Sequence, residues 1–164
     1  MLLILSGLPG TGKTTLARSL ARDLRAVHLR IDTIEYALHV AGVAQTDDKG
    51  YRIAYALAED NLKVGLTVIA DSVNPIAITR DAWRAVATRA NVRAIDVEIV
   101  CSDLAEHRRR VESRRSDIEG YTVTWREVVD REYEAWARVD VRVDTAGRSI
   151  DEVCVTLARA LASL

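Results

Sequence analysis

The sequence of 164 residues contains no phenylalanine, two prolines, two cysteines and one methionine. Aromatic residues make up only 5% of the chain, so leucine, valine, isoleucine and alanine must fill most of the interior. The two cysteines, Cys101 and Cys154, form neither a C-x-x-C redox motif nor a zinc-ligand pattern. Because no disulfide framework is present, we expect a protein of a reducing, cytoplasmic compartment.

The chain also lacks an excess of either charge, since its formal net charge is −1 at pH 7. This balance gives no overall attraction to nucleic acid or to a membrane, although it is compatible with a local basic face. Long apolar runs are missing too. The N-terminal run, Met1 to Leu5, leads directly into a glycine-rich motif and predicts a buried strand rather than a signal peptide or a membrane span. The length predicts one domain over residues 1–164.

The most specific motif is Gly7-Leu8-Pro9-Gly10-Thr11-Gly12-Lys13-Thr14, which matches the phosphate-binding loop G-x-x-x-x-G-K-S/T at every fixed position. The expected strand before it and helix after it create an anion site, because backbone N–H groups and the helix dipole both face the phosphate. We expect Lys13 to reach the β- and γ-phosphates and the Thr14 hydroxyl to bind Mg²⁺. A dinucleotide fingerprint would need glycine at Thr15 and is excluded. The expected nucleotide-binding residues here are Gly7, Pro9, Gly10, Thr11, Gly12, Lys13, Thr14 and Thr15.

Strand and helix signals alternate along the chain. Apolar runs predict strands at residues 1–5, 26–31, 66–70, 92–100 and 139–143. Helical spacing predicts helices at residues 14–24, 33–40, 51–64, 76–89, 103–116, 124–136 and 150–161. This alternation is typical of a parallel α/β sheet with right-handed crossovers. Trp83, Trp125 and Trp136 lie on apolar helix faces, so we expect core packing rather than base stacking.

Two aspartates stand at the ends of predicted strands, where ligands of open parallel sheets bind. Asp71 closes the third strand, the place where P-loop enzymes hold Mg²⁺ with an acid. Asp32 follows the second strand and is better placed to accept a proton from an acceptor hydroxyl. Either residue could instead be the N-cap of the next helix, and Asp32 before Thr33 fits that alternative well. We favour a functional role for both.

An arginine-rich segment follows the fourth strand. It contains Arg108, Arg109, Arg110, Arg114 and Arg115. Arg110 and Arg114 are four residues apart, so they share one face of a helix and could together neutralise a transferring phosphoryl group. The alternative is a solvated face paired with neighbouring acids. The helix breaker at residues 118–120 would let a segment around 108–122 close as a lid.

Taken in order, these motifs resemble those of the small P-loop kinases. The matching stretches are Gly7 to Thr14, Arg30-Ile31-Asp32, Val68 to Asp71 with Asn74, Cys101 through Arg114, and Val143-Asp144-Thr145. The chain is most similar to the branch of AAA-family ATPases that also holds polynucleotide 5′-kinase, the zeta toxins and chloramphenicol phosphotransferase. The resemblance covers nearly the whole chain. It implies a nucleoside-monophosphate-kinase-like P-loop fold, with a five-stranded parallel sheet, helices on both faces and a short lid.

The resemblance also implies an activity, the transfer of the ATP γ-phosphate to a hydroxyl with Mg²⁺ as cofactor. Lys13 and Thr14 take the phosphate and metal roles, and Asp32 matches the catalytic base. Arg110 matches the lid arginine, with Arg114 as its helper.

On the acceptor side, Asp71 through Asn74, with Arg80, resembles a segment of the polynucleotide kinase branch. The loop Thr145-Ala146-Gly147 resembles the one beside the adenine ring. Shikimate-type kinases carry a second acid where Ile34 stands here, so the acceptor does not carry over. We expect a small-molecule acceptor such as a nucleoside, sugar or antibiotic-like compound. A polynucleotide 5′-hydroxyl kinase, which the near-neutral charge disfavours, and a non-catalytic nucleotide switch remain alternatives.

Overall fold

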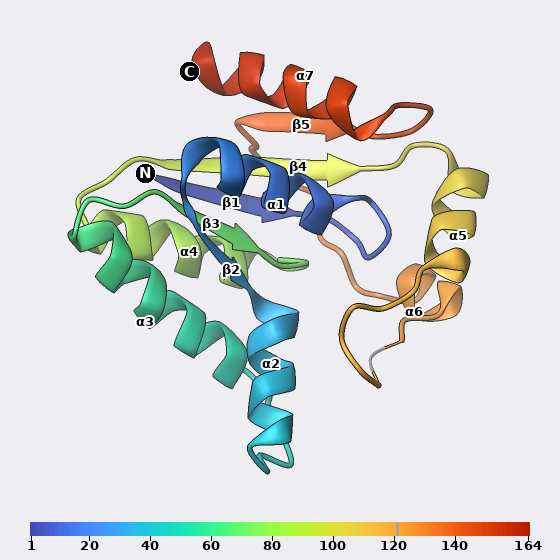
Figure 1. Cartoon of the computed structure of the whole chain (residues 1–164), viewed down its shortest axis with the longest axis horizontal. Coiled ribbons are helices and arrows are strands. Elements are labelled where there is room, and N and C mark those ends of the chain that lie inside the picture. The colour runs from blue at the N-terminus through green and yellow to red at the C-terminus, as the bar shows by residue number, and fades with distance from the viewer. Residues whose placement is uncertain (121) are drawn as a thin grey trace.

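The computed structural model describes residues 1–120 and 122–164 as an α/β fold in three layers (Figure 1). Its strands are β1 (Leu2–Ser6), β2 (Val27–Arg30), β3 (Val68–Asp71), β4 (Ala94–Val100) and β5 (Val141–Asp144). They form one sheet in the order β2-β3-β1-β4-β5, and every neighbouring pair is parallel. The structure therefore confirms the predicted five-stranded parallel sheet.

Helices cover both faces of this sheet, as expected. They are α1 (Lys13–Leu24), α2 (Ile31–Val40), α3 (Lys49–Lys63), α4 (Ala77–Arg89), α5 (Leu104–Ser113), α6 (Trp125–Val129) and α7 (Ile150–Ala162). Helices α1 and α7 pack on one face, while α3 and α4 pack on the other. Helices α5 and α6 lie beyond the carboxyl ends of the strands (Figure 1). Among the helices of the described residues, none combines the length and the apolar character needed to cross a bilayer.

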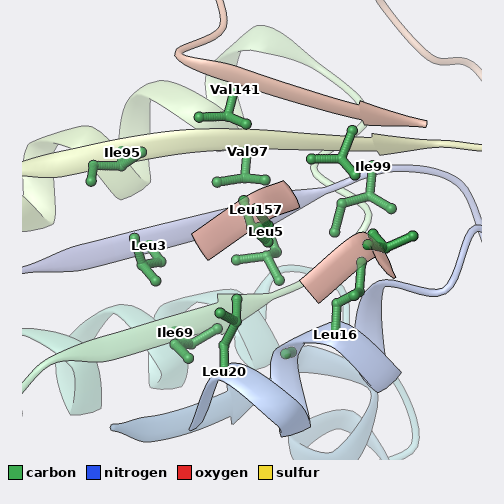
Figure 2. Packing of buried hydrophobic residues seen from close by; sticks show 13 residues of the cluster. Leu3, Leu5, Leu16, Leu20, Ile69, Ile95, Val97, Ile99, Val141 and Leu157 are labelled. Atoms are coloured by element: carbon green, nitrogen blue, oxygen red, sulfur yellow. The ribbon is translucent and has the colours of Figure 1, made fainter. Parts of the chain in front are cut away.

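Successive side chains of β1 point to opposite faces of the sheet, so they divide the hydrophobic core into two clusters. Leu3 and Leu5 pack against α1 and α7, where Leu16 and Leu157 meet them (Figure 2). Leu2 and Ile4 face the opposite cluster with α3 and α4, which includes the fully buried Trp83. Full burial of each such leucine is worth about 1.5–3 kcal/mol. Burial on both faces explains why β1 is a continuous apolar run and fixes the loop that follows it.

Two predicted helices end early. Helix α5 stops at Ser113, and Arg114 has an extended backbone with φ −65° and ψ 126°. Helix α6 begins with a capping box between Thr124 and Glu127 but ends at Val129. The helix expected to continue to residue 136 is therefore wrong beyond Val129.

The aromatic residues after α6 take their positions from tertiary contacts instead. The Arg80 guanidinium on α4 lies 4.3 Å from the Trp136 ring centroid and 5.3 Å from that of Tyr133. Trp83 packs in the core as predicted. Trp125 is only half-buried, with its ring in edge contact with His107 at 5.2 Å.

Candidate active site

A cavity of about 310 Å³ lies where the phosphate loop meets the carboxyl ends of the strands. Its lining includes these side chains: Lys13, Thr14, Asp32, Asp71, Arg110 and Arg114. They are the six residues for which the sequence predicted catalytic or metal-binding roles. The structure thus brings all six to one place.

The loop between β1 and α1 needs its glycines. A Cβ added at Gly7, which has φ +143°, would lie 2.1 Å from the Ile99 carbonyl oxygen. A Cβ at Gly10 would lie 2.5 Å from Cγ2 of Val111 on α5. Gly12 occupies the N-cap of α1 with φ 95° and offers no side chain to cap the helix. The first N–H groups of α1 therefore suit an anion in the cavity.

Lys13 reaches back along this loop. Its Nζ donates a hydrogen bond to the Leu8 carbonyl oxygen at 3.1 Å, and the side chain is almost wholly buried. Burial lowers the pKa of Lys13, while the negative charges of Asp71 and Asp32 oppose that shift. A phosphate group beside Lys13 would add further negative charge and stabilise the ammonium form.

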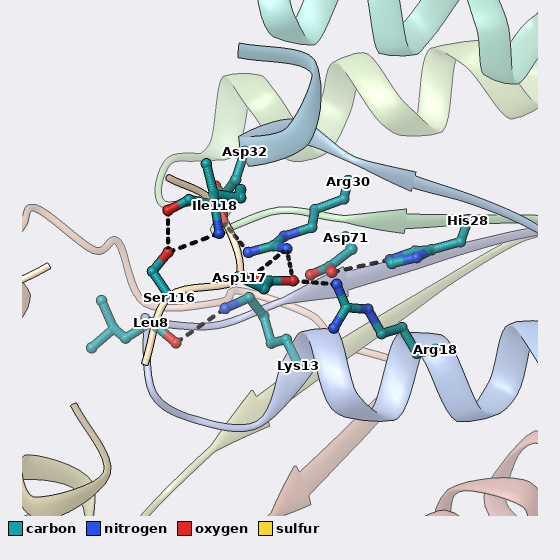
Figure 3. Close-up of polar contacts among 10 residues, drawn as sticks. All are labelled: Leu8, Lys13, Arg18, His28, Arg30, Asp32, Asp71, Ser116, Asp117 and Ile118. Carbon is teal, nitrogen blue, oxygen red and sulfur yellow. Dashed lines mark hydrogen bonds and ion pairs between the residues drawn. The ribbon is translucent and has the colours of Figure 1, made fainter. Parts of the chain in front are cut away.

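Asp71, the last residue of β3, is buried beside the loop. Its Oδ2 lies 3.1 Å from Nε2 of His28 on β2 (Figure 3). Burial raises the pKa of the Asp71 carboxyl, but the His28 hydrogen bond, the Lys13 charge and the Thr14 hydroxyl outweigh it and hold that pKa below its ordinary value. A carboxylate beside a hydroxyl provides the oxygen ligands that Mg²⁺ prefers next to substrate phosphates. These residues therefore fit the predicted metal.

The depressed pKa of Asp71 predicts how stability depends on pH. Its ionised form stabilises the fold above its ordinary pKa of 3.8, and this contribution is lost as the pH falls through the lower folded value. The difference in free energy of unfolding between wild type and Asp71→Asn should therefore be largest near neutral pH and shrink below about pH 4. Urea unfolding at a series of pH values measures it. A difference that stays constant down to about pH 3 would contradict this expectation.

Asp32 is not an N-cap. Helix α2 begins at Ile31 and its N-cap is Arg30, so Asp32 stands in the first turn of the helix. Its Oδ2 lies 3.3 Å from Nη2 of Arg30, and its side chain is 27% exposed. The capping explanation is therefore wrong. The remaining structural explanations are the ion pair with Arg30 and a favourable interaction with the α2 dipole.

Arg110 and Arg114 do not share a helical face, because α5 ends between them. Arg110 donates two hydrogen bonds to Thr145. One runs from Nη1 to the hydroxyl Oγ1 at 2.8 Å, and the other runs from Nη2 to the carbonyl oxygen at 2.9 Å. It also pairs with Glu106 at 2.6 Å. Arg114 lies along the cavity, and its positive charge contributes to the lowered pKa of Lys13. Of the two, Arg114 has the more direct electrostatic effect on the phosphate lysine.

A second cavity of about 320 Å³ adjoins the first on the side of β5 and α7. Arg110 and Thr15 line both cavities, and Thr145 lines only the second. The Thr145 hydroxyl donates to the Thr11 carbonyl oxygen at 3.0 Å and so joins this loop to the phosphate loop. Gly147 does not line this cavity, and its N–H donates to Glu106 Oε2 at 2.8 Å.

Asn74 and Arg80 line neither of these two cavities, and their expected place on the acceptor side stays a prediction. The Asn74 amide is fully buried, donates to Ser6 Oγ at 2.9 Å and accepts from Trp83 Nε1 at 3.2 Å. Arg80 donates to the Asn74 carbonyl oxygen at 2.9 Å and stacks on Trp136. Both side chains hold the turn between β3 and α4 in place.

Sequence reasoning missed an ion cluster at the cavity. Arg18 on α1 and Arg30 on β2 both contact Asp117, which follows α5 (Figure 3). It also missed His28, whose contact with Asp71 requires β2 and β3 to be neighbours. These residues belong to common types in unremarkable patterns, so only the strand order and the chain path reveal them.

Known proteins share this architecture. APS kinase CysC of Mycobacterium tuberculosis, solved with AMPPNP and APS, has a TM-score of 0.74 and 23% identity over 98% of this chain and 96% of that one. Kti12 of Chaetomium thermophilum, solved with ADP-AlF3, has a TM-score of 0.69 and 24% identity over 98% of each chain. A gluconokinase of Sinorhizobium meliloti 1021 has a TM-score of 0.67 and 16% identity over 98% of this chain and 91% of that one.

A comparison with curated protein sequences finds no match. The family profile AAA_33, described as an AAA domain, matches residues 2–137. This match includes the phosphate loop, Asp32, Asp71 and the arginine-rich α5. The chain therefore belongs to the AAA_33 family of AAA domains, and it has the fold of the small P-loop kinases.

Proposed function

We propose that this protein is an ATP-dependent kinase that transfers the γ-phosphate to a hydroxyl of a small-molecule acceptor. The observation that carries the proposal is the joint presence of Lys13, Asp32 and Arg114 in one cavity. A nucleotide switch needs only the phosphate loop and its metal residues. A kinase also needs a proton acceptor and a positive charge at the transferring phosphate, which are the chemistries of Asp32 and Arg114.

The second cavity suits the nucleoside part of ATP. Apolar side chains of Leu16, Ile150 and Val153 line it and could contact an adenine ring, while Arg110 stands between it and the phosphate cavity. The solved CysC and Kti12 structures, which share the fold, contain adenine nucleotides. In this arrangement the nucleotide runs from the side of α7 toward Lys13.

Transfer would then proceed at the first cavity. Lys13 and the loop N–H groups hold the phosphates, and Mg²⁺ bound by Thr14 and Asp71 would neutralise their charge. Asp32 accepts the hydroxyl proton as the acceptor oxygen bonds to the γ-phosphorus. The bond from that phosphorus to the bridging oxygen breaks, and ADP leaves with the electron pair. Arg114 stabilises the charge on the transferring group.

Of the segment that resembles the polynucleotide kinase branch, residues 71–73 line the first cavity, whereas Asn74 and Arg80 are buried and do not. A phosphate-transfer screen with γ-labelled ATP, using nucleosides, sugars, aminocyclitols, antibiotics and 5′-hydroxyl oligonucleotides, tests the proposal. We expect label on at least one small hydroxyl compound and none with Lys13→Ala. Label on oligonucleotides alone would assign the alternative kinase class. Nucleotide binding without any transfer would favour the switch.

Substitutions of Arg114 and Arg110 should have different effects on turnover and on ATP binding. Arg114→Ala should lower kcat by about 10²-fold with little change in ATP affinity, because its charge acts on the transferring phosphate. Arg110→Ala should mainly weaken ATP binding, because Arg110 holds Thr145 beside the second cavity. Titration calorimetry and steady-state kinetics measure both. Arg108→Ala is the matched control, since Arg108 is exposed and pairs with Glu112 at 2.8 Å. Equal effects of Arg108→Ala and Arg114→Ala would contradict the assignment.

A further inference from the structure

The chain that follows α5, residues 114–120, lies over the phosphate loop, and we call it the lid segment. Arg114, Arg115 and Asp117 of this segment all line the first cavity. Ser116 shapes a local turn, because its Oγ donates to the Ile118 carbonyl oxygen at 2.8 Å and accepts from the Ile118 N–H at 3.1 Å. The turn leaves Ile118 buried and directs Asp117 toward the sheet (Figure 3).

The Asp117 carboxylate meets two guanidinium groups from the rigid part of the fold. Nη1 of Arg30 donates to both of its oxygens, at 3.0 and 2.8 Å. Arg18, one turn beyond the phosphate loop on α1, donates to the same carboxylate. The hydrogen bond from Arg18 and the charge of Arg30 hold the pKa of Asp117 well below its usual range. The Asp117 carboxyl is therefore ionised throughout the physiological pH range.

Of the two contacts, the one with Arg30 matters more. The Arg18 side chain is 52% exposed, and exposed ion pairs contribute little because solvent screens them. The Arg30 side chain is only 4% exposed, so removal of Asp117 would leave a buried charge that keeps its contact with Asp32 but loses two hydrogen bonds to a carboxylate. The Asp117 carboxylate is 41% exposed, so the pair is half-buried, and the unfavourable part of breaking it is the Arg30 charge that stays buried. Movement of the lid segment away from the sheet must break this contact.

We propose that Asp117 is a positioning residue whose ion pairs with Arg30 and Arg18 hold the lid segment over the phosphate loop. Arg114 and Arg115 are thereby kept along the cavity before any ligand binds. Because Arg30 also contacts Asp32, the same guanidinium connects the lid segment to the proposed base. The catalytic consequence rests on the proposed kinase function, whereas the closed position of the segment does not.

Limited trypsin digestion tests the closed position directly, because trypsin cleaves after Arg114 and Arg115. Asp117→Asn keeps the side-chain shape but removes the charge, so the segment should open more often. Since cleavage follows the open population, we expect hydrolysis at these two bonds to be about tenfold faster, as measured by mass spectrometry without nucleotide. Asp117→Glu should restore most of the protection.

The matched control is Glu119→Gln, which removes the same charge from the same segment but from a side chain near Tyr36. Wild-type cleavage rates in Asp117→Asn, or equal acceleration in Glu119→Gln, would overturn the proposal. Asp117→Asn should also lower kcat more than ATP affinity. If the protein transfers no phosphate yet Asp117→Asn is still cleaved faster, the kinase proposal fails and the lid contact stands.

Discussion

Replacement of Asp32 by asparagine is expected to lower kcat by about 10²–10⁴-fold, the usual effect of losing a positioned general base. Asparagine has nearly the same size and can still accept a hydrogen bond from Arg30. It cannot take a proton from the acceptor hydroxyl. ATP affinity should stay close to that of wild type, because the phosphates bind at Lys13 and the loop. Steady-state kinetics at saturating acceptor, with calorimetric titration of Mg-ATP, measure both quantities.

A purely structural role for Asp32 gives a different result. An acid in the first turn of a helix is worth only about 0.3–1 kcal/mol through the helix dipole. Asp151→Asn is the matched control, because Asp151 is an exposed acid in the first turn of α7, outside the lining of the first cavity. Both variants lose the charge that interacts with a helix dipole, but only Asp32→Asn should lose activity. If Asp32→Asn retains more than about a tenth of wild-type kcat, the base assignment is wrong.

Replacement of Lys13 by alanine is expected to weaken ATP binding by about 10²-fold or more and to abolish measurable transfer, since a buried charge paired with phosphate is lost. The fold should persist. Burial already disfavours the Lys13 ammonium group, so its removal costs little free energy of unfolding. Titration calorimetry and thermal unfolding test the two statements separately.

Lys63→Ala is the control for this change, because Lys63 pairs with Glu59 at the far end of α3 and does not line the first cavity. It should bind ATP as wild type does. Unchanged Mg-ATP affinity and turnover in Lys13→Ala would contradict nucleotide binding at this loop.

Local patterns made much of the fold predictable. The phosphate loop is specified by its own glycines and by the flanking apolar strand and helix, all within residues 1–24. Apolar runs and helical spacing placed all five strands, with ends that differ by at most two residues. The strand ends then predicted Asp71 beside the loop, because parallel strands present their carboxyl ends at one edge.

The ends of helices and the partners of polar side chains were harder to predict. The spacing of Arg110 and Arg114 indicated one helical face, but α5 stops between them. Asn74 and Arg80 resembled acceptor contacts, yet Trp83 and Trp136 draw them into the packing around α4. The sequence does not distinguish a ligand-binding arginine or asparagine from a structural one, because the role of the side chain depends on which partner it contacts in the folded protein.

The sequence by itself determined the phosphate loop, the parallel α/β class and the acids at the strand ends, since these depend on residues close together in the chain. The tertiary structure alone decided which cations meet the lid segment and which acid meets His28. Asp117 is 99 positions from Arg18 and 87 from Arg30, and Asp71 is 43 from His28. Such contacts form only when the strand order places β2 beside β3 and returns the chain after α5 over the loop, which no local pattern encodes.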